Sequence, residues 1–173
     1  MDFTHFYKIT QAVQEFTTID EIRAVLGKCR RSGQRIGLVP TMGYLHKGHL
    51  SLVNLALKES DVVVSSIFVN PKQFNNPNDL ALYPRDLERD KQLLKEANVH
   101  AVFIPNVEEI YSSDFETRVD LSRISENHEG RFRPGHFVGV STIVAMLFNI
   151  VSPDVAVFGE KDFQQLRLIE KMV

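Results

Sequence analysis

The pattern of apolar and polar positions predicts a first helix near the N-terminus. Thr18 and Glu21 have the spacing of a capping box. Apolar side chains follow at helical intervals, at Ile22, Val25, Leu26 and Cys29. Gly33 then supplies a C-terminal stop signal. The pattern predicts one amphipathic helix that starts after Thr18 and ends before Gly33.

Strand-like and helix-like segments alternate along the rest of the chain. Short, β-branched, almost wholly apolar runs predict strands covered on both faces; they occupy residues 35–39, 62–69, 101–104 and 155–158, with a weaker run at 117–121. Helical patterns occupy residues 49–59, 84–97 and 140–151, and a last one runs to residue 173. Two segments rich in Pro, Asn and Gly, residues 70–83 and 125–139, predict long surface loops.

Strand, helix and strand repeated in this way predict an α/β fold, a doubly wound parallel sheet with helices on both faces. Ligands of such sheets bind beyond the carboxyl ends of the strands, where the strand order reverses. The 173 residues with 43% hydrophobic content fit one domain, and the chain shows no repeat or linker. Candidate chemistry is therefore expected directly after strands.

Composition limits the classes of partner. Charged residues make up 24% of the chain and the net charge is −2, so no global field attracts nucleic acid or a membrane surface. The single cysteine, Cys29, excludes an internal disulfide and suits a reducing compartment. Residues 1–10 lack a leader pattern, and no apolar run is long enough to span a membrane. We expect a cytoplasmic, unprocessed protein that binds small molecules.

The strongest motif, PTMGYLHKGHL at residues 40–50, directly follows the first predicted strand. His46 and His49 would share the first turn of the next helix, where unpaired backbone N–H groups favour a phosphate. Gly43 and Gly48 would let a nucleotide approach the backbone. The histidines could instead bind a metal, although no third ligand is evident, or simply cap the helix.

Residues 158–166, FGEKDFQQL, also follow a predicted strand. Lys161 could neutralise phosphate charge, Asp162 could accept from a ribose or cap the helix, and Gln164 and Gln165 could bind hydroxyl groups. The alternative is an ordinary solvated helix start.

Two further polar segments contain candidate ligand contacts. Asn70 and Gln73 in SIFVNPKQF are neutral side chains that suit a polyol, unless they form a plain Asn-Pro turn. Residues 129–142 contain Arg131, Arg133 and His136, which suggest a loop that contacts an anion rather than RNA.

The ordered series PTMGYLHKGH, SIFVNPKQF, YPRDLERD, GRFRPGHFVGVST and FGEKDFQQL resembles the pantothenate synthetase family over residues 36–173. That family belongs to the nucleotidyltransferases with an HxGH motif. The resemblance implies that residues 1–173 are one Rossmann-like, nucleotide-binding N-terminal domain, and that the smaller C-terminal domain of the family is absent. It also implies a homodimer.

The resemblance assigns roles to individual residues. His46, His49 and Lys161 would be catalytic, with His49 at the position of the proton donor. The implied ATP contacts are Met42, Gly43, Tyr44, Leu45, His46, Lys47, Gly48, His49, Gly159, Glu160, Lys161 and Asp162. Gln73 and Gln165 would bind pantoate, whereas Asn70 and Gln73 would receive β-alanine.

The implied reaction is the ATP-dependent condensation of pantoate with β-alanine through a pantoyl-adenylate, which releases AMP and pyrophosphate. Mg²⁺ would be held mainly through the ATP phosphates, with no metal ligands from the protein. Lys47 stands where many relatives are expected to carry an acid. The family's KMSKS-like segment and lid come from the C-terminal domain. Two alternatives therefore stay open: a non-catalytic fragment that binds nucleotide and pantoate, or another HxGH nucleotidyltransferase.

Overall fold

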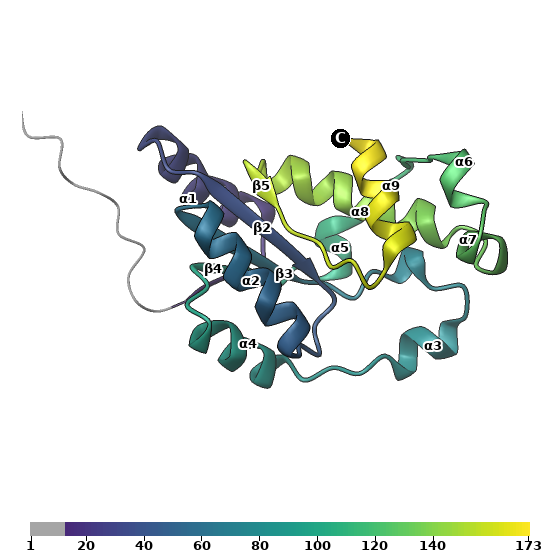
Figure 1. The fold of residues 1–173 in the computed structure, drawn as a ribbon, viewed down its shortest axis with the longest axis horizontal. Coiled ribbons are helices and arrows are strands. Elements are labelled where there is room, and N and C mark those ends of the chain that lie inside the picture. Colours follow the sequence, from purple (N-terminus) through teal and green to yellow (C-terminus); the bar gives the residue numbers. More distant parts are fainter. Residues whose placement is uncertain (1–12) are drawn as a thin grey trace, which may run out of the picture.

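Five parallel strands form the centre of the fold, which the computed structural model describes for residues 13–173 (Figure 1). The strands are β1 (Gln14–Phe16), β2 (Ile36–Thr41), β3 (Val62–Ile67), β4 (Ala101–Phe103) and β5 (Val155–Ala156). Their order in the sheet is β1-β4-β3-β2-β5, and each pairing is parallel. The predicted α/β class with a parallel sheet is confirmed. The expectation about residues 1–10 lies outside the described residues.

The strand order reverses beside β2. From β2 the chain moves outward through β3 to β4, and it then returns to place β5 on the other side of β2. β2 and β3 pair along their whole length, from Ile36 and Val62 to Thr41 and Ile67, whereas β5 pairs with only two residues of β2. A doubly wound sheet leaves a crevice beyond the strand ends at such a reversal.

Helices cover both faces of the sheet and bury two separate apolar clusters (Figure 1). One face packs against α1 (Ile19–Arg31), α8 (His136–Val151) and α9 (Phe163–Met172). The opposite face packs against α2 (Lys47–Glu59) and α4 (Leu87–Glu96). Side chains alternate between the two clusters along β2, with Leu38 in the first and Val39 in the second.

The first helix forms as its sequence pattern predicts. The hydroxyl of Thr18 accepts a hydrogen bond from the backbone N–H of Glu21, and the Glu21 carboxylate accepts from the backbone N–H of Thr18. Gly33 has a φ of +78°, the left-handed conformation that ends many helices. Both predicted ends of this helix are confirmed.

One predicted strand is wrong and one strand was not predicted. Residues 117–121 form no strand; instead Val119 is held on α8, where Thr142 accepts from its N–H and Ser141 donates to its carbonyl. These side-chain bonds replace a strand ladder. The fifth strand of the sheet is β1, whose three residues are too few for a periodic signal.

The two predicted loops contain short helices. The first includes η1 (Pro71–Gln73) and α3 (Pro77–Leu82), and the segments around the second include α5 (Val107–Ile110), α6 (Ser122–Ser125) and α7 (Glu129–Phe132). α8 begins at His136, four residues before the predicted start. α4 begins after Asp86, whose carboxylate caps the Arg89 N–H, so Pro84 lies before the helix rather than in its first turn.

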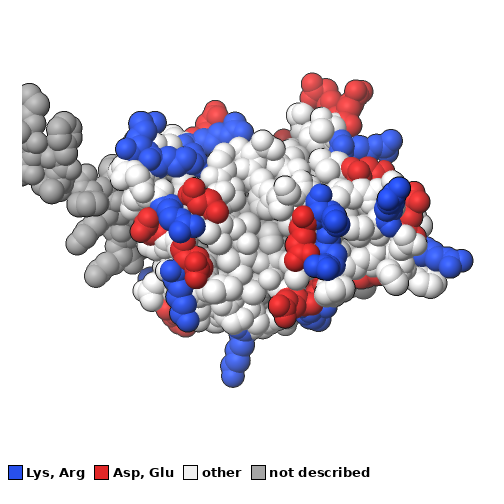
Figure 2. All heavy atoms as spheres, turned by 45° about the horizontal axis from the view of Figure 1, so that its top comes forward, with Lys and Arg blue, Asp and Glu red and all other residues white. Residues whose placement is uncertain are grey.

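Charges of both signs are interspersed on the face shown in Figure 2, in keeping with the net charge of −2. Within residues 13–173, no helix combines the length and apolar character needed to cross a membrane.

Candidate active site

A cavity of about 800 Å³ lies beyond the carboxyl ends of β2 and β5, where the strand order reverses. Its walls come from the loop after β2, the first turns of α2, the η1 segment, α8, and the segment that joins β5 to α9. This volume is in the usual range for small-molecule sites. The cavity therefore lies where the alternation of strands and helices predicted ligand binding.

The loop after β2 makes a tight left-handed turn. Gly43 has a φ of +81° and Tyr44 a φ of 52°. The Thr41 hydroxyl accepts from the Gly43 N–H at 3.2 Å and donates to the Ser66 carbonyl at 2.7 Å. A Cβ on residue 43 would lie 2.9 Å from a carboxylate oxygen of Asp90. Glycine is required here by both the conformation and the close packing.

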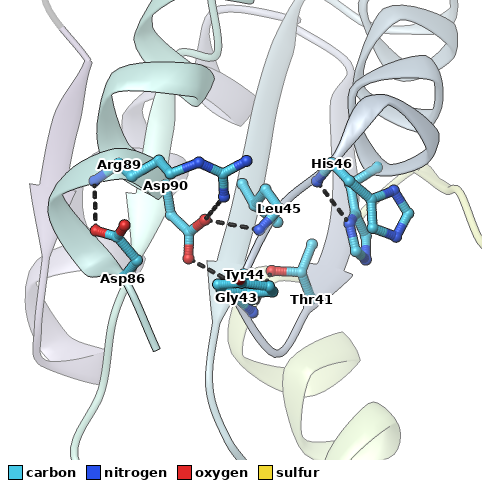
Figure 3. Close-up of polar contacts among 9 residues, drawn as sticks. Thr41, Gly43, Tyr44, Leu45, His46, Asp86, Arg89 and Asp90 are labelled. Carbon is cyan, nitrogen blue, oxygen red and sulfur yellow. Dashed lines mark hydrogen bonds and ion pairs between the residues drawn. The ribbon is translucent and has the colours of Figure 1, made fainter. Parts of the chain in front are cut away.

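Asp90 of α4 reaches across to this turn (Figure 3). Its two carboxylate oxygens accept from the backbone N–H groups of Tyr44 at 2.6 Å and Leu45 at 2.7 Å, and the residue is 1% exposed. The YPRDLERD motif ends at Asp90, but the sequence pattern assigns no role to this residue. The available signal was an acidic residue on the helical stripe of Leu87 and Leu94.

His46 and His49 together cap the N-terminus of α2. Nδ1 of His46 accepts from the Gly48 N–H at 3.0 Å, and Nδ1 of His49 accepts from the His46 N–H at 3.3 Å. The two ring centroids are 4.2 Å apart. A neutral ring that accepts at Nδ1 carries its proton on Nε2, so each histidine keeps one N–H donor for a ligand.

Both rings line the cavity, His46 exposed and His49 half-buried. Burial lowers the pKa of His49, and the neighbouring His46 lowers it further. Nearby Asp90 and Asp162 oppose this shift, whereas Lys161 adds to it. The lowered pKa favours the neutral form of His49. Capping uses only the Nδ1 atoms of the two rings, so it leaves each Nε2 atom without a role in starting α2.

The two segments predicted to contact ATP meet across the cavity. The lining includes Met42, Gly43, Tyr44, His46, Gly48 and His49 from one side, and Gly159, Glu160, Lys161 and Asp162 from the other. Asp162 occupies the N-cap position of α9, but its side chain makes no capping hydrogen bond. The carboxylate thus remains available to a ligand.

Two of the residues that the resemblance implies as ATP contacts, Leu45 and Lys47, do not line the cavity. Leu45 is fully buried in the cluster beneath α2, so its side chain cannot reach a ligand; it anchors the loop instead. Lys47 is exposed and is not part of the cavity lining. In both cases the motif gave the position along the chain but not the direction of the side chain.

Asn70 and Gln73 lie side by side in the cavity wall, 1% and 8% exposed. The Asn70 amide donates to the Gln73 side-chain oxygen and to the Gly139 carbonyl, and it accepts from Lys72 N–H and Tyr111 hydroxyl. Its hydrogen-bonding capacity is filled. The Gln73 amide nitrogen donates only to the Met42 sulfur at 2.9 Å, a weak acceptor that a ligand oxygen could replace.

Gln164 and Gln165 point in different directions from the first turn of α9. Gln164 donates to the carbonyls of Ile124 and Asn127 and accepts from the Glu129 N–H, so it holds the loop around α7. Gln165 is half-buried in the cavity wall. Of the two adjacent amides, only Gln165 belongs to the cavity lining.

The expected anion-contacting loop does not form a wall of the cavity. His136 is 6% exposed and its Nδ1 donates to the Gln73 carbonyl at 2.8 Å. Arg133 pairs with Glu129. Neither these residues nor Arg131 line the cavity, so their predicted contact with an anion stays a prediction. His136 instead supports the backbone beneath Gln73.

Apolar side chains from both sides of the sheet complete the cavity lining, and the sequence did not predict them. They are Leu52 and Leu55 of α2, Val140, Ile143, Val144 and Leu147 of α8, and Phe158. Their helical spacing resembles that of ordinary core positions, so the pattern alone gives no reason to place them at a ligand site. Such apolar surface can hold the flat base of a nucleotide or methyl groups of a substrate.

Among residues 13–173, no group of three or more His, Cys, Asp or Glu side chains could hold a metal ion. The two histidines of the HxGH motif thus lack further ligands nearby in this part of the chain. Their arrangement fits hydrogen bonding to an anion rather than metal coordination.

Comparison with known proteins gives one consistent family. Residues 14–173 match the family model "Pantoate-beta-alanine ligase". The chain is 55% identical over 161 residues to the pantothenate synthetase of Sinorhizobium medicae, covering 93% of this chain and 55% of that protein. It is 56% identical over 155 residues to that of Thermoanaerobacter sp., covering 90% of this chain and 55% of that protein. The chain spans about half the length of these relatives.

Solved structures agree. The pantothenate synthetase of Thermus thermophilus matches with a TM-score of 0.87 and 50% identity, over 93% of this chain and 57% of that one. The pantoate-beta-alanine ligase of Francisella tularensis, solved as a complex with "Beta-gamma ATP" and β-alanine, matches with a TM-score of 0.89 and 42% identity, over 94% of this chain and 62% of that one. The chain belongs to the pantoate-beta-alanine ligase family.

Proposed function

We propose that this chain binds ATP and pantoate in the cavity beyond β2 and β5, and that it forms the nucleotide-binding part of a pantothenate synthetase. The pantoate carboxylate attacks the α-phosphorus of ATP and pyrophosphate leaves. The amine of β-alanine then attacks the acyl carbon of the pantoyl-adenylate, AMP leaves, and an amide bond forms. No covalent bond to the protein is needed.

The observation that carries this proposal is that His46 and His49 line the cavity and cap α2 through Nδ1, which leaves their Nε2–H groups as donors for a ligand. Backbone N–H groups and the helix dipole at this end favour phosphate. Lys161, across the cavity, adds a positive charge. These groups would bind phosphate oxygens more strongly as charge builds in the transition state, which is catalysis by positioning and electrostatics.

Two neutral side chains of the cavity lining suit a hydroxy acid. Gln73 and Gln165 are neutral amides that can bind the hydroxyl and carboxylate groups of pantoate. A nucleotidyltransferase that acts on a phosphorylated acceptor would need basic side chains at these positions. The neutral character of the two residues therefore favours pantoate.

We assign β-alanine to the part of the cavity near Asn70 and Gln73, which both belong to its lining. The Francisella tularensis relative was solved as a complex with β-alanine, which supports β-alanine as a substrate. Gln73 would make the direct contact through its amide nitrogen, because Asn70 is already fully hydrogen-bonded. Asn70 would act by fixing the orientation of the Gln73 amide.

Mg²⁺ would enter with ATP and would neutralise part of the triphosphate charge. The side chains around the cavity offer no three-ligand cluster within the described chain, so the phosphates supply most of its ligands in this proposal. His46, His49 and Lys161 would bind the phosphate oxygens that the ion leaves free.

Residues 1–173 would be the N-terminal, nucleotide-binding domain of a cytoplasmic homodimer, and the remaining length of the relatives would correspond to the smaller second domain. The family resemblance supports these assignments. Sedimentation of the chain at several concentrations tests the dimer, since a monomer at all concentrations would contradict it.

Calorimetric titration with ATP and with pantoate tests the proposed substrates. We expect both to bind, and we expect AMP to form when β-alanine is added. Binding of ATP without pantoate would indicate another HxGH nucleotidyltransferase. Binding of both without AMP would indicate a non-catalytic fragment.

A further inference from the structure

Asp90 makes an unusual contact for a residue in a surface helix. It lies near the start of α4, 45 residues after Leu45 and 46 after Tyr44, and its carboxylate reaches the backbone of the turn after β2. Both oxygens are used, at 2.6 and 2.7 Å, and the residue is 1% exposed (Figure 3). Hydrogen bonds to a buried carboxylate are among the strong ones in proteins.

We propose that Asp90 is a positioning residue of the nucleotide site, which holds the turn at Tyr44 and Leu45 so that His46 and His49 face the cavity. This inference rests on the proposed function, because it takes the two histidines to be nucleotide contacts. Asp90 itself would not touch the substrate; it is not part of the cavity lining that contains the histidines.

The turn needs such support because its conformation is unfavourable. Tyr44 has a φ of 52°, a region that side chains other than glycine adopt rarely. Neither Tyr44 nor Leu45 can use its N–H within α2, since the helix begins only after His46. The Asp90 carboxylate satisfies both N–H groups in the strained conformation and so selects it.

By holding Leu45, Asp90 also fixes the backbone at the two histidines. Leu45 is fully buried and precedes His46, the N-cap of α2. When Asp90 fixes the Leu45 N–H, it also fixes the position from which the His46 backbone donates to His49. Arg89 supports the same turn, because its guanidinium lies 5.6 Å from the centre of the Tyr44 ring and 4.0 Å from the Asp90 carboxylate.

Asp90→Asn tests this role, since it keeps the shape of the side chain but leaves one of the two N–H groups facing a donor. The matched control is Asp86→Asn, which removes the same charge from the same helix and keeps a good N-cap for α4. We expect ATP affinity, measured by calorimetry on the folded chain, to fall about tenfold or more in Asp90→Asn, as for loss of a hydrogen bond to a charged group. Asp86→Asn should stay within about twofold of the unaltered chain, which is the expectation for a surface site.

The pKa of His49, followed by NMR, separates positioning from a simple charge effect. The negative charge of Asp90 raises the pKa of His49, so removing the charge alone would lower it. Release of the turn would expose His49, and loss of burial would raise its pKa toward the ordinary value. We expect a rise. Unchanged ATP affinity, or a fall in the pKa of His49, would overturn the proposal.

Gly43→Ala provides a second route if Asp90→Asn does not fold. Its Cβ would lie 2.9 Å from the Asp90 carboxylate and would displace it from the turn. The same loss of ATP affinity and the same rise in the pKa of His49 are expected, and their absence would count against the proposal. If the unaltered chain binds no ATP, the proposed function fails, whereas the NMR measurement still decides whether Asp90 positions His49.

Discussion

The backbone N–H of His46 donates to Nδ1 of His49 at 3.3 Å, and the centres of the two rings lie 4.2 Å apart. This hydrogen bond helps to cap α2 and also determines which nitrogen of His49 can donate to a ligand. Because the Nδ1 atom of each ring accepts a capping hydrogen bond, Nε2 keeps the proton and remains free for a ligand. The same two side chains therefore begin α2 and present its donors to the cavity.

His49→Ala should weaken phosphate binding and slow adenylation. The change removes one Nε2–H donor and the hydrogen bond that the His46 backbone makes. Loss of one donor that stabilises transition-state charge costs about 3 kcal/mol, so exchange of labelled pyrophosphate into ATP by the complete enzyme should fall by about a hundredfold or more. Near-normal exchange would refute the role.

His100→Asn is the matched control for that experiment. His100 is a half-buried histidine outside the cavity lining, and its Nδ1 accepts from the Val63 N–H at 3.0 Å. An asparagine oxygen can accept in nearly the same place as Nδ1. ATP binding and exchange should therefore be unchanged, which would show that loss of an imidazole elsewhere has no general effect.

Gln165→Ala and Gln164→Ala should have opposite consequences although the residues are adjacent. Gln165→Ala should weaken pantoate binding about fivefold or more with little change in melting temperature, because one uncharged hydrogen bond is lost from the cavity wall. Gln164→Ala should lower the melting temperature and leave pantoate affinity unchanged, because it releases the loop around α7. Calorimetry and thermal unfolding distinguish the two, and equal effects on pantoate affinity would contradict the assignment.

Local patterns were sufficient for the parts of the fold that depend on neighbouring residues. The capping box at Thr18 and Glu21, the stop at Gly33 and the apolar runs of the inner strands all reappear in the structure. The HxGH segment was also found correctly at the end of a strand, since its residues are consecutive and its glycines and histidines are distinctive.

The remaining features depend on contacts between distant segments. Leu45 is buried and Lys47 is exposed although both lie in the same motif, because the left-handed turn and the start of α2 decide the direction of each side chain. The hydrogen-bonding capacity of the Asn70 amide is filled by Tyr111 and Gly139, which lie far along the chain. The role of Asp90 depends on the approach of α4 to the turn. The spacing of apolar residues along the sequence does not reveal such contacts between distant segments.

Gly139→Ala should both destabilise the protein and disturb the part of the cavity lining that contains Asn70 and Gln73. A Cβ at this position would lie 2.3 Å from the Lys72 carbonyl oxygen, so α8 and η1 would have to separate. Overpacking of this kind typically costs about 1–3 kcal/mol. The shift would also move the Gly139 carbonyl away from Asn70 and so loosen Gln73. Urea unfolding should show a lower stability, and pantoate titration should show a lower affinity.

Gly27→Ala is the matched control for the change at Gly139. Gly27 lies inside α1, where an added Cβ would only touch the Arg31 side chain at 3.5 Å. Replacing glycine by alanine within a helix is favourable by up to about 1 kcal/mol. The urea midpoint should stay the same or rise, with pantoate binding unchanged. A loss of stability at Gly139 no larger than at Gly27 would show that the contact between α8 and η1 is not tight.

Three partly or fully buried histidines should make the protein less stable in weak acid. Burial lowers the pKa of His49, His100 and His136 in the folded chain. In the unfolded chain a histidine takes up its proton near pH 6.5, whereas the folded chain does so only at lower pH. Because the unfolded state then binds more protons, the free energy of unfolding should fall as the pH drops below about 6.5.

The contribution of His100 to this acid sensitivity can be isolated. Protonation of its Nδ1 would break the hydrogen bond from the Val63 N–H, and His100→Asn keeps an acceptor there but removes the titrating group. The urea midpoint of the unaltered chain should fall between pH 7.5 and 5.5, a window above the range in which most carboxylates titrate. It should fall less in His100→Asn. Equal falls in the two proteins would show that His100 is as free to take up a proton in the folded chain as in the unfolded one, so that its burial makes no contribution to the acid sensitivity.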